Sequence, residues 1–253
     1  MRAGIMRRTT ILLGLVLSAF VPTARSEEIR VVAVSAVKET YLELIPEFEK
    51  TTGHNVITIW SGTGELLKRV KTGEAFDLAI AGTDALQDLV NGGRLAPGSR
   101  VDFAKSGVGV AVRAGSPKFD IQSSEAVKHA LLSARSIGYS TGPSGLYLQG
   151  LFQRMGIAEQ VKPKLKIPPT GMSVGEFVAR GDAEIGFQQV SELIHVKGVD
   201  FLGPLPDDIQ QMTIFSTGIS TNAKSPSAAE ALSHFLASPA AAPVILKNGL
   251  EPG

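Results

Sequence analysis

Short apolar segments alternate with amphipathic segments from residue 29 onward, and this alternation limits the fold more than any other feature. Strands are favoured by continuous apolar runs, and helices by apolar residues that recur every three or four positions. Strands that alternate with helices favour a parallel sheet covered by helices. In the first part of the chain the predicted strands and helices alternate in the order Ile29–Val34, Glu39–Lys50, Asn55–Trp60, Thr63–Thr72, Phe76–Gly82 and Asp84–Val90.

A second α/β unit follows after the strand predicted at Gly107–Arg113. No Pro-rich or Ser-rich linker separates the units, so we predict two lobes joined by strands that cross between them, near Gly107–Arg113 and Gln210–Ser220. Lobe 1 would comprise residues 27–106 and 211–253, and lobe 2 residues 107–210. The other predicted elements are Ser124–Leu132, Ser136–Tyr139, Ser144–Met155, Lys164–Ile167, Ser173–Arg180, Ala183–Phe187, Phe201–Leu205, Ser225–Leu236 and Pro239–Asn248.

The N-terminus has the pattern of a secretory signal peptide. Arginines precede an apolar run from Ile11 to Val21, and small residues around Ser26 suit cleavage. The apolar run is too short to span a bilayer comfortably. We therefore expect residues 1–26 to be removed and the remaining chain to be exported to the periplasm.

Composition excludes several classes of function. The formal net charge is +1, and no cluster of Lys and Arg interleaves with aromatic residues, so we do not expect a nucleic-acid partner. The chain has no cysteine, which excludes thiol catalysis and cysteine metal sites. Its four histidines show no metal-ligand spacing, and we expect no metal and no cofactor.

Hydroxyl side chains and glycines occupy three predicted strand-to-helix junctions. Ser35 follows the first strand, Thr63 lies within Ser61-Gly62-Thr63-Gly64, and Ser144 follows the Gly-rich segment 138–142. Helix N-termini present unpaired N–H groups and the positive end of a dipole, which together bind anions. Ligands of open parallel sheets bind at the carboxyl ends of strands. The sequence therefore predicts a small-anion site in a cleft between the lobes.

Motifs that would indicate catalysis match this sequence only in part. The segment 138–142 matches G-x-S-x-G, but Pro143 and Gly145 lengthen a turn that is sharp in hydrolases. S-x-x-K at 35–38 and K-T-G at 71–73 lack the third penicilloyl-serine element. Gln188-Gln189 end a predicted strand, where their amides would contact either a polar ligand or a hinge network.

The order of these motifs resembles that of periplasmic molybdate-binding proteins of ABC importers. The resemblance spans nearly the whole predicted mature chain and implies a type II periplasmic binding fold that closes around a tetrahedral oxyanion. It implies that Ser35 and Thr63 donate from lobe 1, Ser144 and Gly171 offer backbone contacts from lobe 2, and Gln189 takes the place of a ligand-binding tyrosine. The quoted motifs are Ser35, Trp60-Ser61-Gly62-Thr63-Gly64-Glu65-Leu66, Phe76-Asp77-Leu78-Ala79-Ile80, Pro143-Ser144-Gly145, Ala183-Glu184-Ile185-Gly186, and Phe235-Leu236-Ala237-Ser238-Pro239 with Gly249.

Two departures from that family leave a second interpretation open. Gln189 replaces the tyrosine, and Glu65 adds a carboxylate beside the presumed anion. Aconitate isomerase has a related fold, and its chemistry needs a base, a role that Glu65 could take while Lys38 binds a carboxylate. A binder of a small di- or tricarboxylate is a third possibility. We favour a monomeric solute-binding protein for molybdate, tungstate or a similar oxyanion, working with an ABC permease.

Overall fold

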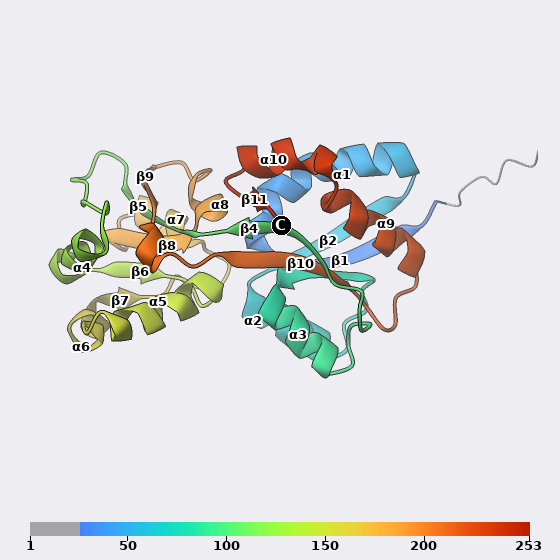
Figure 1. The fold of residues 1–253 in the computed structure, drawn as a ribbon, viewed down its shortest axis with the longest axis horizontal. Coiled ribbons are helices and arrows are strands. Elements are labelled where there is room, and N and C mark those ends of the chain that lie inside the picture. The colour runs from blue at the N-terminus through green and yellow to red at the C-terminus, as the bar shows by residue number, and fades with distance from the viewer. Residues whose placement is uncertain (1–25) are drawn as a thin grey trace, which may run out of the picture.

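The computed structural model describes residues 26–253, so nearly all of the predicted signal peptide lies outside the described residues. It shows two α/β lobes side by side, which confirms the predicted fold class (Figure 1). The sheet of lobe 1 has the order β11-β4-β10-β3-β1-β2, and that of lobe 2 the order β7-β6-β8-β5-β9. The strands are β1 (Glu28–Val34), β2 (Asn55–Ser61), β3 (Leu78–Gly82), β4 (Val101–Ser106), β5 (Val108–Arg113), β6 (Ile137–Tyr139), β7 (Leu165–Lys166), β8 (Ile185–Gln189), β9 (Val199–Pro204), β10 (Thr213–Ile219) and β11 (Glu251–Pro252).

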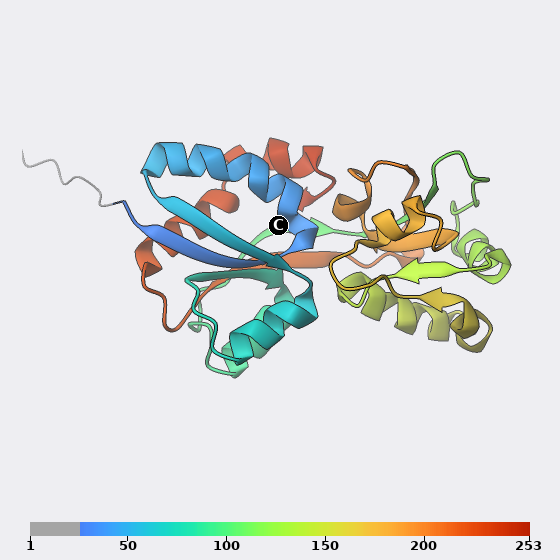
Figure 2. The same ribbon diagram turned by 180° about the vertical axis from the view of Figure 1, so that it is seen from behind.

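The helices cover both faces of each sheet. In lobe 1, α1, α9 and α10 lie on one face, and α2 and α3 lie on the other (Figures 1 and 2). The α-helices are α1 (Lys38–Thr52), α2 (Thr63–Lys71), α3 (Thr83–Asn91), α4 (Ser124–Ser133), α5 (Pro143–Arg154), α6 (Ala158–Val161), α7 (Val174–Ala179), α8 (Val190–Leu193), α9 (Pro226–Leu236) and α10 (Ala242–Lys247). The 3-10 helices are η1 (Ser35–Val37), η2 (Lys162–Lys164), η3 (Asp207–Ile209) and η4 (Pro239–Ala241).

Local sequence explains where several helices begin and end. Ser173 and Glu176 form the predicted capping box at the start of α7, with reciprocal side-chain-to-backbone bonds. Pro226 lies in the first turn of α9, where a missing N–H costs nothing. Pro46 lies inside α1 without ending it, and the helix stops at Gly53 in the left-handed conformation (φ 74°).

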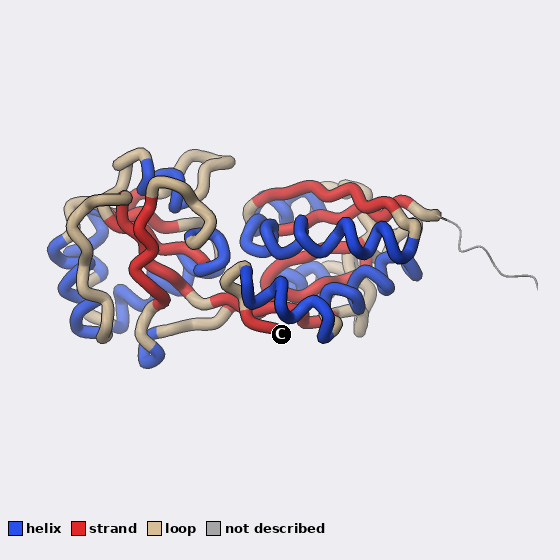
Figure 3. The backbone as a smooth tube through the Cα atoms, turned by 90° about the horizontal axis from the view of Figure 1, so that it is seen from above, coloured by secondary structure: helices blue, strands red, loops and turns tan. Residues whose placement is uncertain are grey.

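Each lobe has its own hydrophobic core, packed around its own sheet. Lobe 1 buries the apolar strands β1 and β3 against Leu66, Leu86 and Phe48. Lobe 2 buries β5, β6 and β8 against α4 and α5. In Figure 3 the strands of each lobe lie between helices.

Two connections join the lobes. One runs from β4 through Gly107 to β5, and the other runs from η3 through residues 210–212 to β10. The Gln210 side chain holds them together, because its oxygen accepts from the Val108 N–H at 2.7 Å and its nitrogen donates to the Val108 carbonyl at 3.0 Å. A side chain at Gly107 would collide with Gln210, since a Cβ there would lie 2.8 Å from its amide.

Several elements differ from the sequence-based expectation. The strand β4 was not predicted, because Asp102 and Lys105 interrupt its apolar pattern. The predicted helix Pro239–Asn248 is a 3-10 turn followed by the shorter α10. The strands β4, β5 and β10 run antiparallel to their neighbours, while β1–β3 and β6–β8 pair in parallel.

No single helix within residues 26–253 has both the length and the apolarity needed to cross a membrane. By length and composition alone, the pair Pro226–Leu236 and Pro239–Lys247, bent by 53°, could do so.

Candidate functional site

Helix N-termini from both lobes point to the edge where the lobes meet. The carboxyl ends of β1, β2 and β3 lead into η1, α2 and α3, and the carboxyl end of β6 leads into α5. Three of these helices have a glycine as N-cap, Gly62 before α2, Gly82 before α3 and Gly142 before α5, and none has a side-chain cap. Their first N–H groups therefore remain available to an anion.

Thr63 of lobe 1 lies against the 140–144 segment of lobe 2. A Cβ placed on Gly142 would lie 4.0 Å from Thr63 Oγ1, and one on Gly82 would lie 3.6 Å from Pro143 Cγ. The N-termini of α2 and α3 thus approach the N-terminus of α5 closely. The structure thus brings Thr63 close to the segment that contains Ser144, and their contact with a ligand stays a prediction.

Ser140 orients the hydroxyl of Ser144. The two Oγ atoms lie 3.1 Å apart, and Ser140 Oγ also accepts from the Gly142 N–H at 3.2 Å. Ser144 is buried, while Ser140 is half-buried. Because the backbone of α5 packs on the Ser140 carbonyl, a Cβ at Gly145 would lie 2.6 Å from the carbonyl carbon and closer still to its oxygen.

Within residues 26–253 this cluster has hydrogen-bond donors but no catalytic triad. Ser140 bonds there to Gly142 and Ser144 and to no histidine, so the G-x-S-x-G match does not form the Ser–His pair of a hydrolase. Residues 26–253 contain no group of three His, Asp or Glu side chains that could hold a metal ion. The arrangement suits hydrogen bonding to an anion by neutral groups.

Ser35 follows the carboxyl end of β1, and Gly171 lies between β7 and α7. Within residues 26–253 neither forms a hydrogen bond to the Thr63 or Ser140–Ser144 segments. Ser35 is exposed at the start of η1, and the preceding Val34 pairs in register with Ser61 at the end of β2. Gly171 is exposed between β7 and α7 with a left-handed φ of 87°. Their contact with a ligand stays a prediction.

The two glutamines at the end of β8 point to opposite faces of the sheet. Gln189 is 1% exposed. In the orientation that satisfies every partner, its amide nitrogen donates to the carbonyls of Ser106 and Gly107 at 3.0 and 3.1 Å, and its oxygen accepts from Thr213 Oγ1 at 2.9 Å. This is the hinge network that the sequence left open as one of two interpretations. Whether Gln189 also reaches a ligand stays a prediction.

The Gln188 side chain lies on the other face of β8, against α7. Its oxygen accepts from the N–H groups of Val174 and Gly175 at 2.9 and 3.4 Å. These N–H groups belong to the first turn of α7, so Gln188 supplies acceptors that the helix lacks at that end.

Glu65 turns outward. It pairs with Arg69 one turn along α2, with 3.4 Å between Oε1 and Nε, and its side chain is 45% exposed. This geometry matches an exposed first-turn carboxylate favoured by the helix dipole, and it gives Glu65 no hydrogen bond to the Thr63 or Ser144 segments. The half-buried Lys38 at the start of α1 forms no ion pair within residues 26–253.

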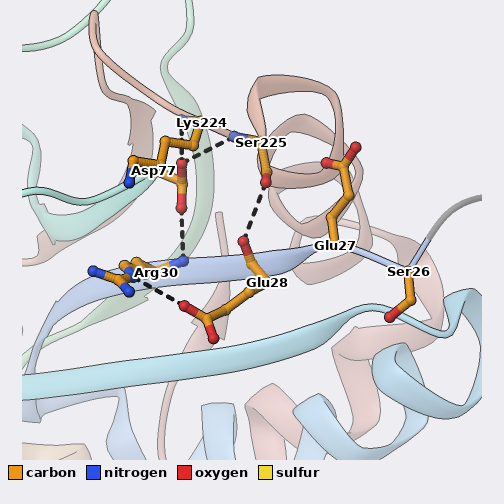
Figure 4. A pocket seen from close by; sticks show the side chains of 7 residues that line it. All are labelled: Ser26, Glu27, Glu28, Arg30, Asp77, Lys224 and Ser225. Atoms are coloured by element: carbon orange, nitrogen blue, oxygen red, sulfur yellow. Dashed lines mark hydrogen bonds and ion pairs between the residues drawn. The ribbon is translucent and has the colours of Figure 1, made fainter.

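A separate hollow at the far end of lobe 1 is structural. It is lined by Ser26, Glu27, Glu28, Arg30, Asp77, Lys224 and Ser225, and Asp77 bonds there to Arg30, Lys224 and Ser225 (Figure 4). Asp77 accepts from the N–H groups of Arg30, Lys224 and Ser225 at 2.8, 2.6 and 3.1 Å. The carboxylate thereby ties β1 to the segment that precedes α9. A second hollow lies beside the exposed Ile57 and Ile59 of β2.

Sequence reasoning missed three contributors to the region between the lobes. Ser140 was considered only as a nucleophile, although its spacing of four residues from Ser144 places both hydroxyls on one turn. Gly82 gave no signal beyond the end of a strand. Ser191 bonds across the lobes to the Ala36 carbonyl at 2.7 Å, and nothing in its local sequence indicates this contact.

Comparison with known proteins places the chain among extracellular binding proteins. The family model described as bacterial extracellular solute-binding protein matches residues 29–251. A protein named aconitate isomerase from Pseudomonas sp. is 37% identical, with 97% of each chain covered. The molybdate-binding protein ModA of Azotobacter vinelandii is 29% identical, with 89% of this chain and 90% of that protein covered.

A solved structure supports the fold independently. The periplasmic molybdate-binding protein of Azotobacter vinelandii superimposes with a TM-score of 0.74 at 22% identity, covering 88% of this chain and 98% of that chain. At this level of identity the comparison shows a common fold.

Proposed function

Because the chain belongs to the bacterial extracellular solute-binding proteins, we propose that it binds a small anion between its lobes in the periplasm and delivers it to an ABC permease. Molybdate or tungstate is the first candidate ligand. One observation carries the proposal: Thr63 at the start of α2 lies close to the Gly142 segment at the start of α5, so donors from both lobes approach each other.

The proposed site would bind the anion with neutral hydrogen-bond donors rather than with a positively charged side chain. Uncapped N–H groups of α2 and α5, together with the hydroxyls of Thr63, Ser140 and Ser144, can bind an anion through neutral hydrogen bonds and helix dipoles. We propose Ser35 and Gly171 as further contacts and Gln189 as a residue that supports the hinge beside the ligand. Hydrogen bonds to charged groups stabilise by about 1.5–3 kcal/mol each, so a few suffice for micromolar affinity.

A second candidate function is aconitate isomerase, and the observation that favours it is the 37% identity over nearly the whole chain to a protein of that name. Such an enzyme must move a proton beside a carboxylate and stabilise the resulting enolate. The donors of Thr63 and the 140–144 segment could bind carboxylate oxygens as well as an oxyanion. Glu65, however, is paired with Arg69 on the outer side of α2, which does not favour it as the base.

A ligand screen with two readouts separates these functions. The melting temperature is measured with molybdate, tungstate, sulfate, cis-aconitate, trans-aconitate and citrate, and conversion of cis- to trans-aconitate is followed by proton NMR. A solute-binding protein for oxyanions should be stabilised by molybdate or tungstate and should show no turnover. Stabilisation by tricarboxylates alone would refute the oxyanion assignment, and turnover would establish the isomerase. No shift with any of the six anions would contradict the proposal of an anion site.

A further inference from the structure

The short helix α8 lies on the side of lobe 2 that faces lobe 1 and packs against η1 of that lobe (Figure 1). Ser191 Oγ donates to the Ala36 carbonyl in η1 at 2.7 Å, and both residues are buried. A Cβ on Gly249, between α10 and β11 of lobe 1, would lie 2.6 Å from Ile194 Cδ1 and 3.2 Å from Val190 Cγ1. Two separate contacts therefore fix the position of α8 against lobe 1.

The 3-10 helix η1 is held by few other polar contacts. The parallel pairing of β1 with β2 ends at Val34, one residue before η1 begins. Val34 is the N-cap of η1 and provides no side-chain hydrogen bond to it. Among residues 26–253, the bond from Ser191 is the only hydrogen bond that joins a side chain to η1. The position of η1 relative to lobe 2 therefore depends on Ser191.

Ser35 begins η1 and directly precedes Ala36. Ser35 is exposed, and its hydroxyl forms no hydrogen bond to any other residue of the described chain. Because peptide units are planar, only a few backbone rotations separate the Ala36 carbonyl from the Ser35 side chain. A bond that fixes the Ala36 carbonyl therefore also restricts where the Ser35 hydroxyl can lie.

We propose that Ser191 is a positioning residue of the anion site: by binding the Ala36 carbonyl, it holds the Ser35 hydroxyl where that hydroxyl meets the anion. The inference rests on the proposed function, in which Ser35 contacts the ligand. A side chain of lobe 2 thereby orders a donor of lobe 1 before the anion arrives. Ordering a donor in advance raises affinity, because immobilising it during binding costs free energy.

The alternative role of the same bond is to join the two lobes without acting on Ser35. The two roles differ in their dependence on the Ser35 hydroxyl. A positioning residue acts through that hydroxyl, so its removal has no effect on affinity once the hydroxyl is gone. A bond that only joins the lobes contributes equally whether or not the hydroxyl is present.

A double-mutant cycle separates the two roles. Isothermal titration with molybdate, tungstate and cis-aconitate gives the dissociation constant of the unsubstituted protein, Ser191→Ala, Ser35→Ala and the double variant. Ser191→Ala should raise the dissociation constant about 2–12-fold, the range that corresponds to one hydrogen bond. In the Ser35→Ala background the same substitution should have no measurable effect. Equal effects in both backgrounds, or none in either, would overturn the inference.

A second pair of variants displaces α8 and leaves Ser191 in place. Gly249→Ala should push Ile194 away from lobe 1 and raise the dissociation constant, as Ser191→Ala does. Gly93→Ala is the matched control: both glycines have a left-handed φ, 72° at Gly249 and 68° at Gly93, but a Cβ on Gly93 meets nothing within 4 Å. The control should bind anions as the unsubstituted protein does. Equal dissociation constants of the two alanine variants would count against the inference.

Amide hydrogen exchange without ligand distinguishes this inference from the proposed function. The Lys38 N–H bonds to the Ser35 carbonyl, so its exchange rate reports the order of η1. Ser191→Ala should accelerate exchange at Lys38 several-fold. If it does so but no anion binds the unsubstituted protein, the proposed function is wrong, and the ordering of η1 by Ser191 stands. If anions bind while Lys38 exchanges equally fast in both proteins, the inference is wrong and the proposed function stands.

Discussion

Asp77 should be among the side chains on which the stability of lobe 1 depends most. Asp77 is 3% exposed, and its carboxylate accepts three backbone hydrogen bonds, at 2.6, 2.8 and 3.1 Å (Figure 4). Asp77→Ala leaves three N–H groups without their acceptor, and each unsatisfied buried donor costs about 1–3 kcal/mol. The adjoining hollow admits water, so the lower end applies, and we expect a loss of about 3 kcal/mol in the free energy of unfolding.

For a chain of this size, such a loss lowers the melting temperature by about 6–12 °C. Urea titration followed by circular dichroism measures the free energy directly. Asp77→Asn keeps one acceptor oxygen and should lose about half as much, near 1–2 kcal/mol. Asp88→Ala, an exposed aspartate of α3, is the matched control and should stay within about 0.5 kcal/mol of the unsubstituted protein.

The structural role of Asp77 also predicts what the substitution leaves intact. The hollow in Figure 4 is lined by residues of lobe 1 only and lies at the far end from the meeting edge of the lobes. Below its melting temperature, Asp77→Ala should therefore bind anions as the unsubstituted protein does. A stability loss below about 1 kcal/mol, or a weakened anion affinity in the folded variant, would refute the reasoning.

Two further predictions concern packing and charge. Gly145→Ala should destabilise the protein by at least about 1–3 kcal/mol, because its Cβ would collide with the backbone of Ser140. The control is Gly150→Ala in the same helix, whose Cβ meets only the end of a flexible arginine; it should be neutral or stabilise by up to about 1 kcal/mol. Equal effects of the two substitutions in urea titration would contradict this account. The Arg100 guanidinium holds the pKa of Asp102 below its usual range, so Asp102 stabilises the fold at neutral pH and loses that contribution as the pH falls through the lowered pKa. Asp102→Asn should show a smaller loss of stability between about pH 5 and 3 than the unsubstituted protein, and an unchanged acid profile would argue against this role.

The alternation of strands and helices could be predicted from sequence because the spacing of apolar residues differs between strands and helices. Leu66 and Val70 lie one turn apart on α2 and are both buried, and Ser173 with Glu176 marks the start of α7. The strand β4 could not be predicted in the same way. There Asp102 accepts hydrogen bonds from Ser216, which is distant in sequence, and from Arg100, which precedes the strand.

The candidate site could be predicted only up to its helix starts. Hydroxyls and glycines mark the N-termini of α2 and α5, but which N-termini meet depends on how the lobes are oriented. The roles of Gln188 and Gln189 depend on which face of β8 each side chain occupies, and the pair by itself does not specify its partners.

The central claim is that donors of both lobes bind one small anion, and the affinity of Thr63→Val tests it most directly. Valine has the shape of threonine without the hydroxyl, and Thr63 is half-buried, so the ligand-free melting temperature should change little. Isothermal titration with whichever of molybdate, tungstate or cis-aconitate binds the unsubstituted protein should show a dissociation constant about 10–150-fold higher for the variant. An unchanged dissociation constant would contradict the claim.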